Sequence, residues 1–557
     1  MSHTGSQNPL NELIATLAAL QTSSDTLNAH PQCKFRGRYY WLERQFDFTE
    51  LNITPVRYPE YDNFANKQNI KSFSLIFATG YLGNPASYYD HLLLKLNTST
   101  DNATELEDTF INYGAKVPAN ENMATYITKG LIGSYSSTFT ADKFYFHKHA
   151  YNDNALRDLW EYELNFDDTT NQLLVAHIWE MLNVSHNYYF FNRNCAYRMA
   201  ELIELATDKP FTQDNLPWEA PQSILQKLSS ATYRGQPVIK SINYIPSKQS
   251  KLYQKYTQLN DDGKVAVNAA IDDIATLTTK KFDTQNTTAA VRVLDTLIDY
   301  YHFISPEKEH PDNEEYRKTL SKRFSLPVST PDFTLNSNSN PHLGHSPSYI
   351  TAGVRNNSEL GMGISLRLRP AYYDILDASY GHVRGASLSM VDVSLTQYSS
   401  TTTIDYIKIV AIENLNGHTT KLPGDKSFAW NMLVGAEQES NACKGCLGYI
   451  TTFGGGYTVS SLQGNLLLNT MINVGVKGNN LNSDILHVDA RLFVNYSFNN
   501  KFSVTTSATH REYFNTNDHH VLTNIAKRYE LAQNWDTRWS IDKDRETAIN
   551  ASIGFYW

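Results

Sequence analysis

A change in the spacing of apolar residues constrains the fold of this chain more than any other feature. In the carboxy-terminal part, apolar and polar residues alternate, so that Leu486, Val488 and Ala490 share one face of the chain while His487 and Asp489 share the other. Successive side chains of a β-strand point to opposite faces of its sheet, and the alternation therefore predicts strands with one apolar and one polar face. The alternating segments are about ten residues long and are separated by turns rich in Asn, Gly, Asp and Ser, which is typical of a closed antiparallel membrane barrel.

We therefore expect residues 345–557 to form an outer-membrane-type β-barrel of about ten to twelve antiparallel strands. The last segment places Ile549, Ile553 and Trp557 on one face and ends on an aromatic residue, which matches the aromatic girdles of such barrels. A soluble β-sandwich with aromatic core residues is the alternative, because the signal of each single barrel strand is weak. No apolar run approaches the roughly 18 residues that a membrane-spanning helix requires, which excludes a helical membrane protein.

Three regions precede the barrel, and the spacing of their apolar residues predicts a multidomain α+β protein. Residues 1–65 are expected to be part of a helical lead-in domain, with an amphipathic helix over residues 10–30. Residues 66–235 have an α/β pattern, and residues 236–330 have that of a helical connector. Within the α/β region we expect strands at 73–79, 91–96 and 109–114, and helices at 156–164, at 173–182 and from Asn194 onward.

The segment around Cys195 contains the residues best suited to chemistry. Asn194 is a good N-cap residue, so Cys195 falls at the first position of a helix. The unpaired N–H groups and the positive end of the helix dipole favour a thiolate there, which is the condition for a nucleophilic cysteine. His91, at the start of a predicted strand, is the candidate general base. The alternatives are that Cys195 is a small buried residue and that His91 is structural. Arg198 is expected either to reach an anionic head group or to form a surface ion pair.

Several motifs occur in a fixed order along the α/β region. They are Gly83-Asn-Pro-Ala-Ser87, His91-Leu-Leu-Leu94, Ile111-Asn-Tyr-Gly-Ala115, Leu159-Trp-Glu-Tyr-Glu-Leu164 and Tyr189-Phe-Phe-Asn-Arg-Asn-Cys195. In this order they resemble the motifs of the Lnb N-terminal periplasmic domain family. The resemblance implies a circularly permuted papain-like domain in which Cys195 is the nucleophile and His91 the general base. It also implies a third residue that orients the imidazole, for which Asn112 is preferred over Thr109.

The resemblance also implies a function, because the family is named for the intramolecular lipoprotein N-acyltransferase. We therefore expect cysteine-dependent acyl transfer or hydrolysis on a lipid-bearing or amide substrate at the periplasmic face of the outer membrane. The alternative is a non-enzymatic outer-membrane barrel with a periplasmic binding or assembly domain. The expected partners are outer-membrane lipid and a lipoprotein or phospholipid substrate, without a cofactor or metal. Nucleic acid is not expected, because 48 Lys and Arg against 57 Asp and Glu give a net charge of −9 and no basic cluster stands out.

The four cysteines give two further expectations. Cys443 and Cys446 are spaced to bridge each other in a loop, whereas a metal site would need a second ligand pair, which is not visible nearby. Cys33 is expected to lie apart from Cys195, because a catalytic thiol in an oxidising periplasm must escape pairing. No Lys or Arg precedes Lys34, so the positive region of a secretory signal is not visible. Either the signal has been removed, or the start lies elsewhere, or the protein is cytosolic.

Overall fold

The computed structural model divides the chain into two compact units, which are described separately. The first comprises residues 1–78, 90–151 and 159–245, and the second comprises the remainder. The structure describes residues 2–22, 27–68, 70–80, 90–98, 108–118, 121–143, 156–182, 184–212, 218–279, 282, 286–305, 311–328, 332–335, 340–461, 464–478, 486–514 and 519–557.

The first unit begins with short helices. They are α1 (Pro9–Leu20), α2 (Pro31–Lys34), α3 (Arg36–Leu42) and α4 (Pro59–Gln68). The helix expected over residues 10–30 therefore ends at Leu20, after which the described chain resumes in a 3₁₀ turn at Leu27–Ala29. Gly37 of α3 lies so close to a later helix that a Cβ atom on it would be 2.8 Å from the Cα of His177. Only glycine permits this close approach of two helix backbones.

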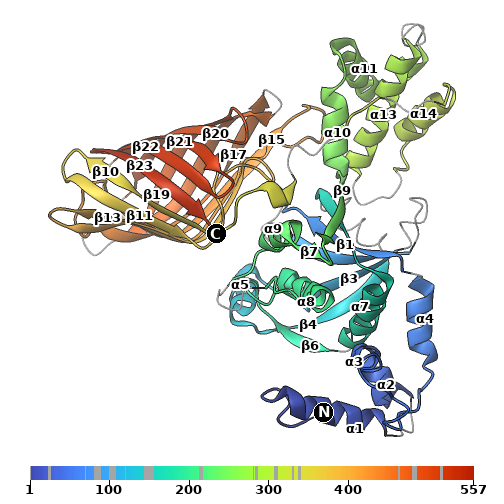
Figure 1. Ribbon diagram of the computed structural model, residues 1–557. Helices are drawn as coiled ribbons and strands as arrows, with labels where there is room; N and C mark the ends of the chain where they lie inside the picture. Colours follow the sequence, from blue (N-terminus) through green and yellow to red (C-terminus); the bar gives the residue numbers. More distant parts are fainter. Residues whose placement is uncertain are drawn as a thin grey trace. The chain divides into compact units, whose positions relative to one another are not determined.

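A seven-stranded sheet forms the centre of the first unit (Figure 1). Its order is β6-β4-β3-β2-β1-β5-β9, and all neighbouring strands are antiparallel. The strands are β1 (Ser72–Ala78), β2 (His91–Asn97), β3 (Thr109–Ala115), β4 (Tyr135–Lys143), β5 (Leu159–Leu164), β6 (Ser185–Tyr188) and β9 (Ile239–Ile245). A small hairpin of β7 (Thr232–Tyr233) and β8 (Gln236–Pro237) lies outside this sheet.

Helices contribute to the main core of the sheet. Among them are α7 (Asp168–Met181), α8 (Cys195–Thr207) and α9 (Pro221–Ser230), and the unit also contains α5 (Met123–Ile132). Leu174, Met199 and Leu225 come from α7, α8 and α9 and join Leu92 and Leu94 of β2 in one buried cluster. Burial of each such side chain contributes about 1.5–3 kcal/mol. The start of α8 is thereby held against β2.

The sheet corrects two expectations from the sequence. The helix expected at 156–164 is wrong, because Leu159–Leu164 is the strand β5, paired with β1 on one side and β9 on the other. A short apolar run has no decisive period, and pairing within the sheet decides its type. The boundary expected at residue 235 is also too early, because β9 is part of the same sheet.

The second unit contains a helical bundle in the region where the sequence predicts a helical connector. Its helices are α10 (Lys248–Thr257), α11 (Asp261–Asp272), α13 (Thr287–Ile304) and α14 (Glu314–Phe324). Leu252, Val267, Leu294 and Leu297 share its buried core. None of the helices in the described ranges is long and apolar enough to cross a membrane.

Twelve antiparallel strands then close into a barrel, so the predicted antiparallel barrel is confirmed (Figure 1). The ring closes because β10 pairs with β23 while β11 pairs with β13. The strands are β10 (Tyr349–Asn357), β11 (Gly361–Arg369), β13 (Ala386–Tyr398), β14 (Thr402–Asn414), β16 (Phe428–Gln438), β17 (Leu447–Ser461), β18 (Leu466–Gly478), β19 (Leu486–Ser497), β20 (Phe502–Tyr513), β21 (His519–Ala532), β22 (Trp535–Lys543) and β23 (Thr547–Tyr556). The short strands β12 (Ala371–Tyr373) and β15 (Gly417–His418) pair with β13 and β17.

The two faces of the barrel wall differ in polarity. On β18, Ile472 and Val474 point outward and are about half exposed, whereas Asn469 and Asn473 are buried on the lumen side. An apolar exterior around a polar interior is the arrangement of a membrane barrel. The single closed sheet excludes the β-sandwich, which needs two sheets packed face to face.

Candidate functional site

Cys195 occupies the first position of α8, as the sequence predicts. The side chain of Asn194 caps this helix by accepting a hydrogen bond from the N–H of Tyr197 at 3.1 Å. Its amide nitrogen donates to the carbonyls of Phe190 at 3.2 Å and Glu219 at 2.8 Å. An N-cap residue contributes about 1 kcal/mol, and these two extra bonds also fix the chain that enters the helix. Three hydrogen bonds of the Asn194 side chain therefore fix the position of Cys195.

His91 and Asn112 meet on one face of the sheet. His91 is the first residue of β2, and Leu94 of β2 pairs with Ile111 of β3. The same antiparallel register places Asn112 opposite Leu93, and residues two apart on a strand share a face. His91 Nε2 lies 2.8 Å from Asn112 Oδ1. Because an amide oxygen only accepts, Nε2 carries a proton and Nδ1 is the nitrogen left for another partner.

His91 also hydrogen-bonds the side chain of Cys195. Burial raises the pKa of the Cys195 thiol, whereas the charge and the hydrogen bond of His91 lower it. The backbone N–H groups of Leu92 and Ala196 also donate to the sulfur, and the pKa lies below its ordinary value. The three residues Cys195, His91 and Asn112 therefore form one hydrogen-bonded line, as a nucleophile, a base and an orienting group would.

Thr109, the other candidate for the orienting residue, lies elsewhere. It pairs with Leu96, five residues along β2 from His91. Its side chain also belongs to the opposite face of β3 from that of Asn112, because odd and even positions of a strand alternate. The structure therefore brings Asn112 to His91 and leaves Thr109 apart.

Arg198 follows Cys195 by one helical turn and is buried, with 9% of its surface exposed. Its guanidinium forms an ion pair with Glu201 at 2.7 Å and lies 3.3 Å from Nδ1 of His186. The guanidinium carbon is 5.7 Å from the centre of the Tyr113 ring. The expected surface ion pair therefore joins a buried arginine to a partly exposed glutamate within α8, and Arg198 also contacts Tyr113 of β3 and His186 of β6.

The remaining cysteines behave as expected. Cys443 and Cys446 form a disulfide, while Cys33 and Cys195 are both free. Cys33 is fully buried, and burial raises the pKa of its thiol. The two free cysteines thus have opposite pKa shifts, and only that of Cys195 favours a thiolate.

Sequence reasoning missed the groups that come from the backbone. The N–H of Leu92 and the carbonyl of Glu219 support the site, yet every residue has such groups and no residue type marks them. Within the described ranges, no three side chains of His, Cys, Asp or Glu gather as a metal site would require. The motif Gly83-Asn-Pro-Ala-Ser87 lies outside the described residues.

Comparisons with protein families divide the chain in a similar way. Residues 60–230 match the model of the Lnb N-terminal periplasmic domain. Residues 338–557 and 1–45 match two domains of unknown function, DUF7840 and DUF7843. No curated protein matches the chain.

Solved structures similar to the chain include outer-membrane proteins. The KdgM porin is 13% identical over 38% of this chain and 99% of its own, with a TM-score of 0.25. The NanC porin is 11% identical over 38% of this chain and 100% of its own, also with a TM-score of 0.25. The COG4313 outer membrane channel from Pseudomonas putida F1 is 9% identical over 42% of this chain and 100% of its own, with a TM-score of 0.26. TM-scores this low support no inference about function.

The family match and the geometry agree on the architecture. The match to a periplasmic domain covers the sheet and helices that hold Cys195, His91 and Asn112. The barrel that follows has the apolar exterior of an outer-membrane protein. The chain therefore combines a region that matches the Lnb N-terminal periplasmic domain family with a closed 12-stranded barrel of the outer-membrane type.

Proposed function

We propose that this protein is a cysteine-dependent acyltransferase or hydrolase that acts on an ester or amide of a lipid-bearing or peptide substrate at the periplasmic face of the outer membrane. One observation supports the proposal above the others: His91 stands between Asn112 and Cys195 and hydrogen-bonds both. A cysteine that serves only in packing does not require a thiol pKa below the ordinary value. Burial alone would have raised the pKa of its thiol.

In the proposed reaction, His91 takes the thiol proton and the thiolate of Cys195 attacks the carbonyl carbon. The carbonyl oxygen becomes an oxyanion, which first-turn N–H groups of α8, including that of Cys195, can stabilise because they have no partner within the helix. His91 then returns the proton to the departing alcohol or amine, and a thioester forms on Cys195.

An acceptor resolves the thioester in the second half of the reaction. His91 removes a proton from an amine or from water, which attacks the thioester carbon, and the thiolate of Cys195 leaves. An amine acceptor makes the reaction an acyl transfer, and water makes it a hydrolysis. The substrate is tested by incubating the full-length protein in detergent with labelled lipoproteins, phospholipids and peptidoglycan peptides. A substrate-derived mass on Cys195 supports the proposal, and the absence of both adduct and product with all three classes favours the binding-domain alternative.

The pH dependence of alkylation tests the lowered pKa of Cys195. As the pH falls, the alkylation rate is expected to decline only below the ordinary pKa of a thiol, because the thiolate persists to lower pH. In His91→Ala, burial is no longer offset by the imidazole, so the decline is expected at higher pH than in the wild type. Intact-mass measurement of iodoacetamide adducts gives both curves. The pH at which each curve inflects is compared between the wild type and His91→Ala. The absolute rates are not compared, because Cys195 is only 3% exposed and access of the reagent limits them.

Asn112 is proposed to position His91 rather than to touch the substrate. Replacing Asn112 by alanine removes the acceptor at Nε2, and turnover is expected to fall by about 10- to 100-fold, less than the loss of the base itself. Asn112→Asp keeps a side-chain oxygen at the same place and is expected to recover part of the rate. The pH dependence of turnover should change in Asn112→Ala as well. Equal rates in Asn112→Ala and the wild type would contradict the assignment.

A further inference from the structure

The chain between β12 and β13 folds into the interior of the barrel. Residues 374–382, called the plug segment below, are folded against the inside of the barrel wall. Leu376, Asp377 and Ala378 are all buried. A loop on the barrel rim would leave such residues in water, so their burial places the segment within the lumen.

Hydrogen bonds show that the plug segment crosses the lumen. The carbonyl of Ile375 accepts from Nδ2 of Asn495 on β19 at 3.1 Å, and that of Leu376 accepts from Oγ of Ser503 on β20 at 2.7 Å. The wall runs β13-β14-β16-β17-β18-β19-β20, so β19 and β20 lie five and six strands from β13. In a ring of twelve strands this is the opposite side. The segment therefore spans the lumen from wall to wall.

Two carboxylates also hold the plug segment to the strands β11, β22 and β23 of the wall. Asp377 accepts from Arg369 of β11 at 2.8 Å, from Arg538 of β22 at 2.5 Å and from the hydroxyl of Tyr556 of β23 at 2.7 Å. Asp374 lies 2.6 Å from Arg538 and 3.0 Å from Arg369. Charge-assisted bonds of this kind are the stronger hydrogen bonds in proteins. The segment is thus fixed on both sides of the lumen.

Apolar packing fills the space that remains around the segment. Ile375 packs against a buried cluster that includes Leu467 and Met471 of β18 and Phe493 of β19. Near the other end of the segment, Gly381 lies against Pro341, where an added Cβ atom would be 2.6 Å from the proline Cβ. The plug segment is therefore closely packed near both of its ends.

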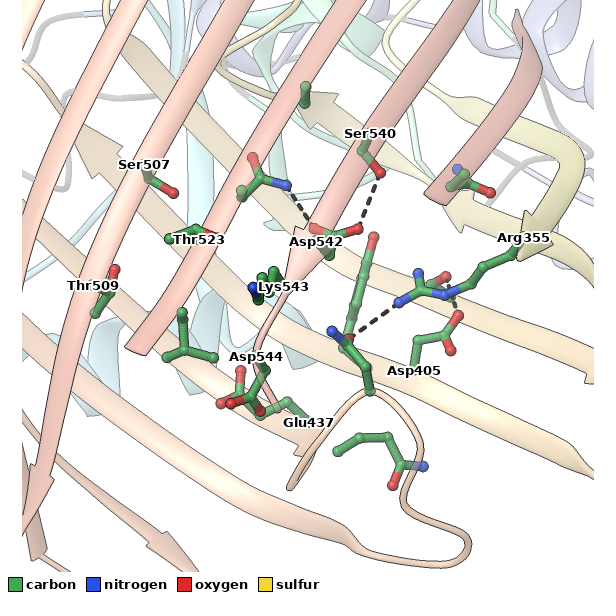
Figure 2. A pocket seen from close by; sticks show the side chains of 18 of the residues that line it. Arg355, Asp405, Glu437, Ser507, Thr509, Thr523, Ser540, Asp542, Lys543 and Asp544 are labelled. Atoms are coloured by element: carbon green, nitrogen blue, oxygen red, sulfur yellow. Dashed lines mark hydrogen bonds between the residues drawn. The ribbon is translucent and has the colours of Figure 1, made fainter. Parts of the chain in front are cut away.

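A cavity of about 570 Å³ lies in the barrel lumen, and Figure 2 shows some of the side chains that line it. Asp374, Ile375 and Leu376 are part of its lining. Polar side chains such as Ser507 and Asp542 line its wall, and Ser540 hydrogen-bonds Asp542 at 3.1 Å. The lumen is therefore a polar cavity that the plug segment closes at one end.

We propose that the barrel does not conduct solutes and serves as a sealed membrane anchor for the rest of the chain. The seal lies at the end of the barrel where its first and last strands begin and end, since Asp377 bonds Tyr556 of the last strand. A barrel of twelve strands without such a segment would leave a water-filled path. The plug segment interrupts that path by crossing it, by packing against apolar side chains and by binding arginines of the wall.

Conductance in planar lipid bilayers tests this proposal with the full-length protein. The wild type is expected to give no conductance steps. A variant in which residues 375–381 are replaced by a short Gly/Ser linker is expected to give steps of the size of an open barrel of this width. Heat-modifiable migration on a gel shows that each variant has a folded barrel. Steps in the wild type would overturn the proposal, as would a folded linker variant that remains silent.

Two double variants that change only side-chain charge test the proposal if the linker variant does not fold. Asp374→Asn/Asp377→Asn removes the two charges that hold the plug segment and is expected to produce intermittent steps. Asp405→Asn/Asp542→Asn changes two carboxylates of the cavity wall and is expected to stay silent like the wild type. Equal steps in the two double variants would show that lumen charge governs passage and would overturn the proposal, as would silence in both.

Discussion

Cys195→Ser and His91→Ala are each expected to lower turnover by at least about 10³-fold, to the background rate. A serine hydroxyl is not ionised near neutral pH, and its oxygen cannot replace the thiolate that His91 stabilises. Without the imidazole, the buried thiol keeps its proton and the leaving group receives none. Turnover of the labelled substrate found in the screen above measures both losses.

The double variant tests whether the two residues act together. Because nucleophile and base act as a unit, Cys195→Ser/His91→Ala should be little worse than either single variant. Cys33→Ser is the matched control, since Cys33 is the other free cysteine and is equally enclosed. It is expected to retain the wild-type rate. Loss of activity in Cys33→Ser, or activity that persists in Cys195→Ser, would contradict the assignment of Cys195 as the nucleophile.

Ile472→Arg is expected to destabilise the barrel in a bilayer by about 2–4 kcal/mol. Ile472 lies in the middle of β18 and points outward, with 55% of its surface exposed. Its neighbours across the two adjacent strands are Gly455 and Ala490, which offer no partner for a charge. A guanidinium at this position must therefore enter the lipid alone. Urea titration of the protein in vesicles, followed by heat-modifiable migration, measures the change.

Ser507→Arg is the matched control, because it adds the same side chain to the other face of the wall. Ser507 of β20 lines the polar cavity, where water and carboxylates are close, and the expected cost is small. Equal destabilisation by Ile472→Arg and Ser507→Arg would contradict a lipid-facing exterior. A carboxy-terminal half that folds as a monomer without detergent would contradict it as well.

Several features of the protein were predictable because they depend on neighbours in the sequence. Alternation along a strand records which side chains face lipid, so Leu486 and Leu492 are exposed on the outer face while His487 and Phe493 are buried on the lumen side. Capping is equally local, and Asn194 therefore predicted the start of α8 at Cys195. The bridge between Cys443 and Cys446 spans two intervening residues and follows from spacing alone. The permuted papain-like topology and the catalytic roles stay predictions.

Other features were decided only by contacts between distant parts of the chain. The segment Leu159–Leu164 is a strand because β1 and β9 pair with its two edges. His91 reaches Cys195 because α8 packs on β2 in the common core, and the plug segment is recognisable only from partners on β19, β20 and β22. A sequence pattern predicts the face on which a side chain lies and the residue at which a helix begins or ends. Both depend on residues within a few positions. Strand pairing, barrel closure and the meeting of His91 with Cys195 depend on residues tens to hundreds of positions apart, which no local pattern contains.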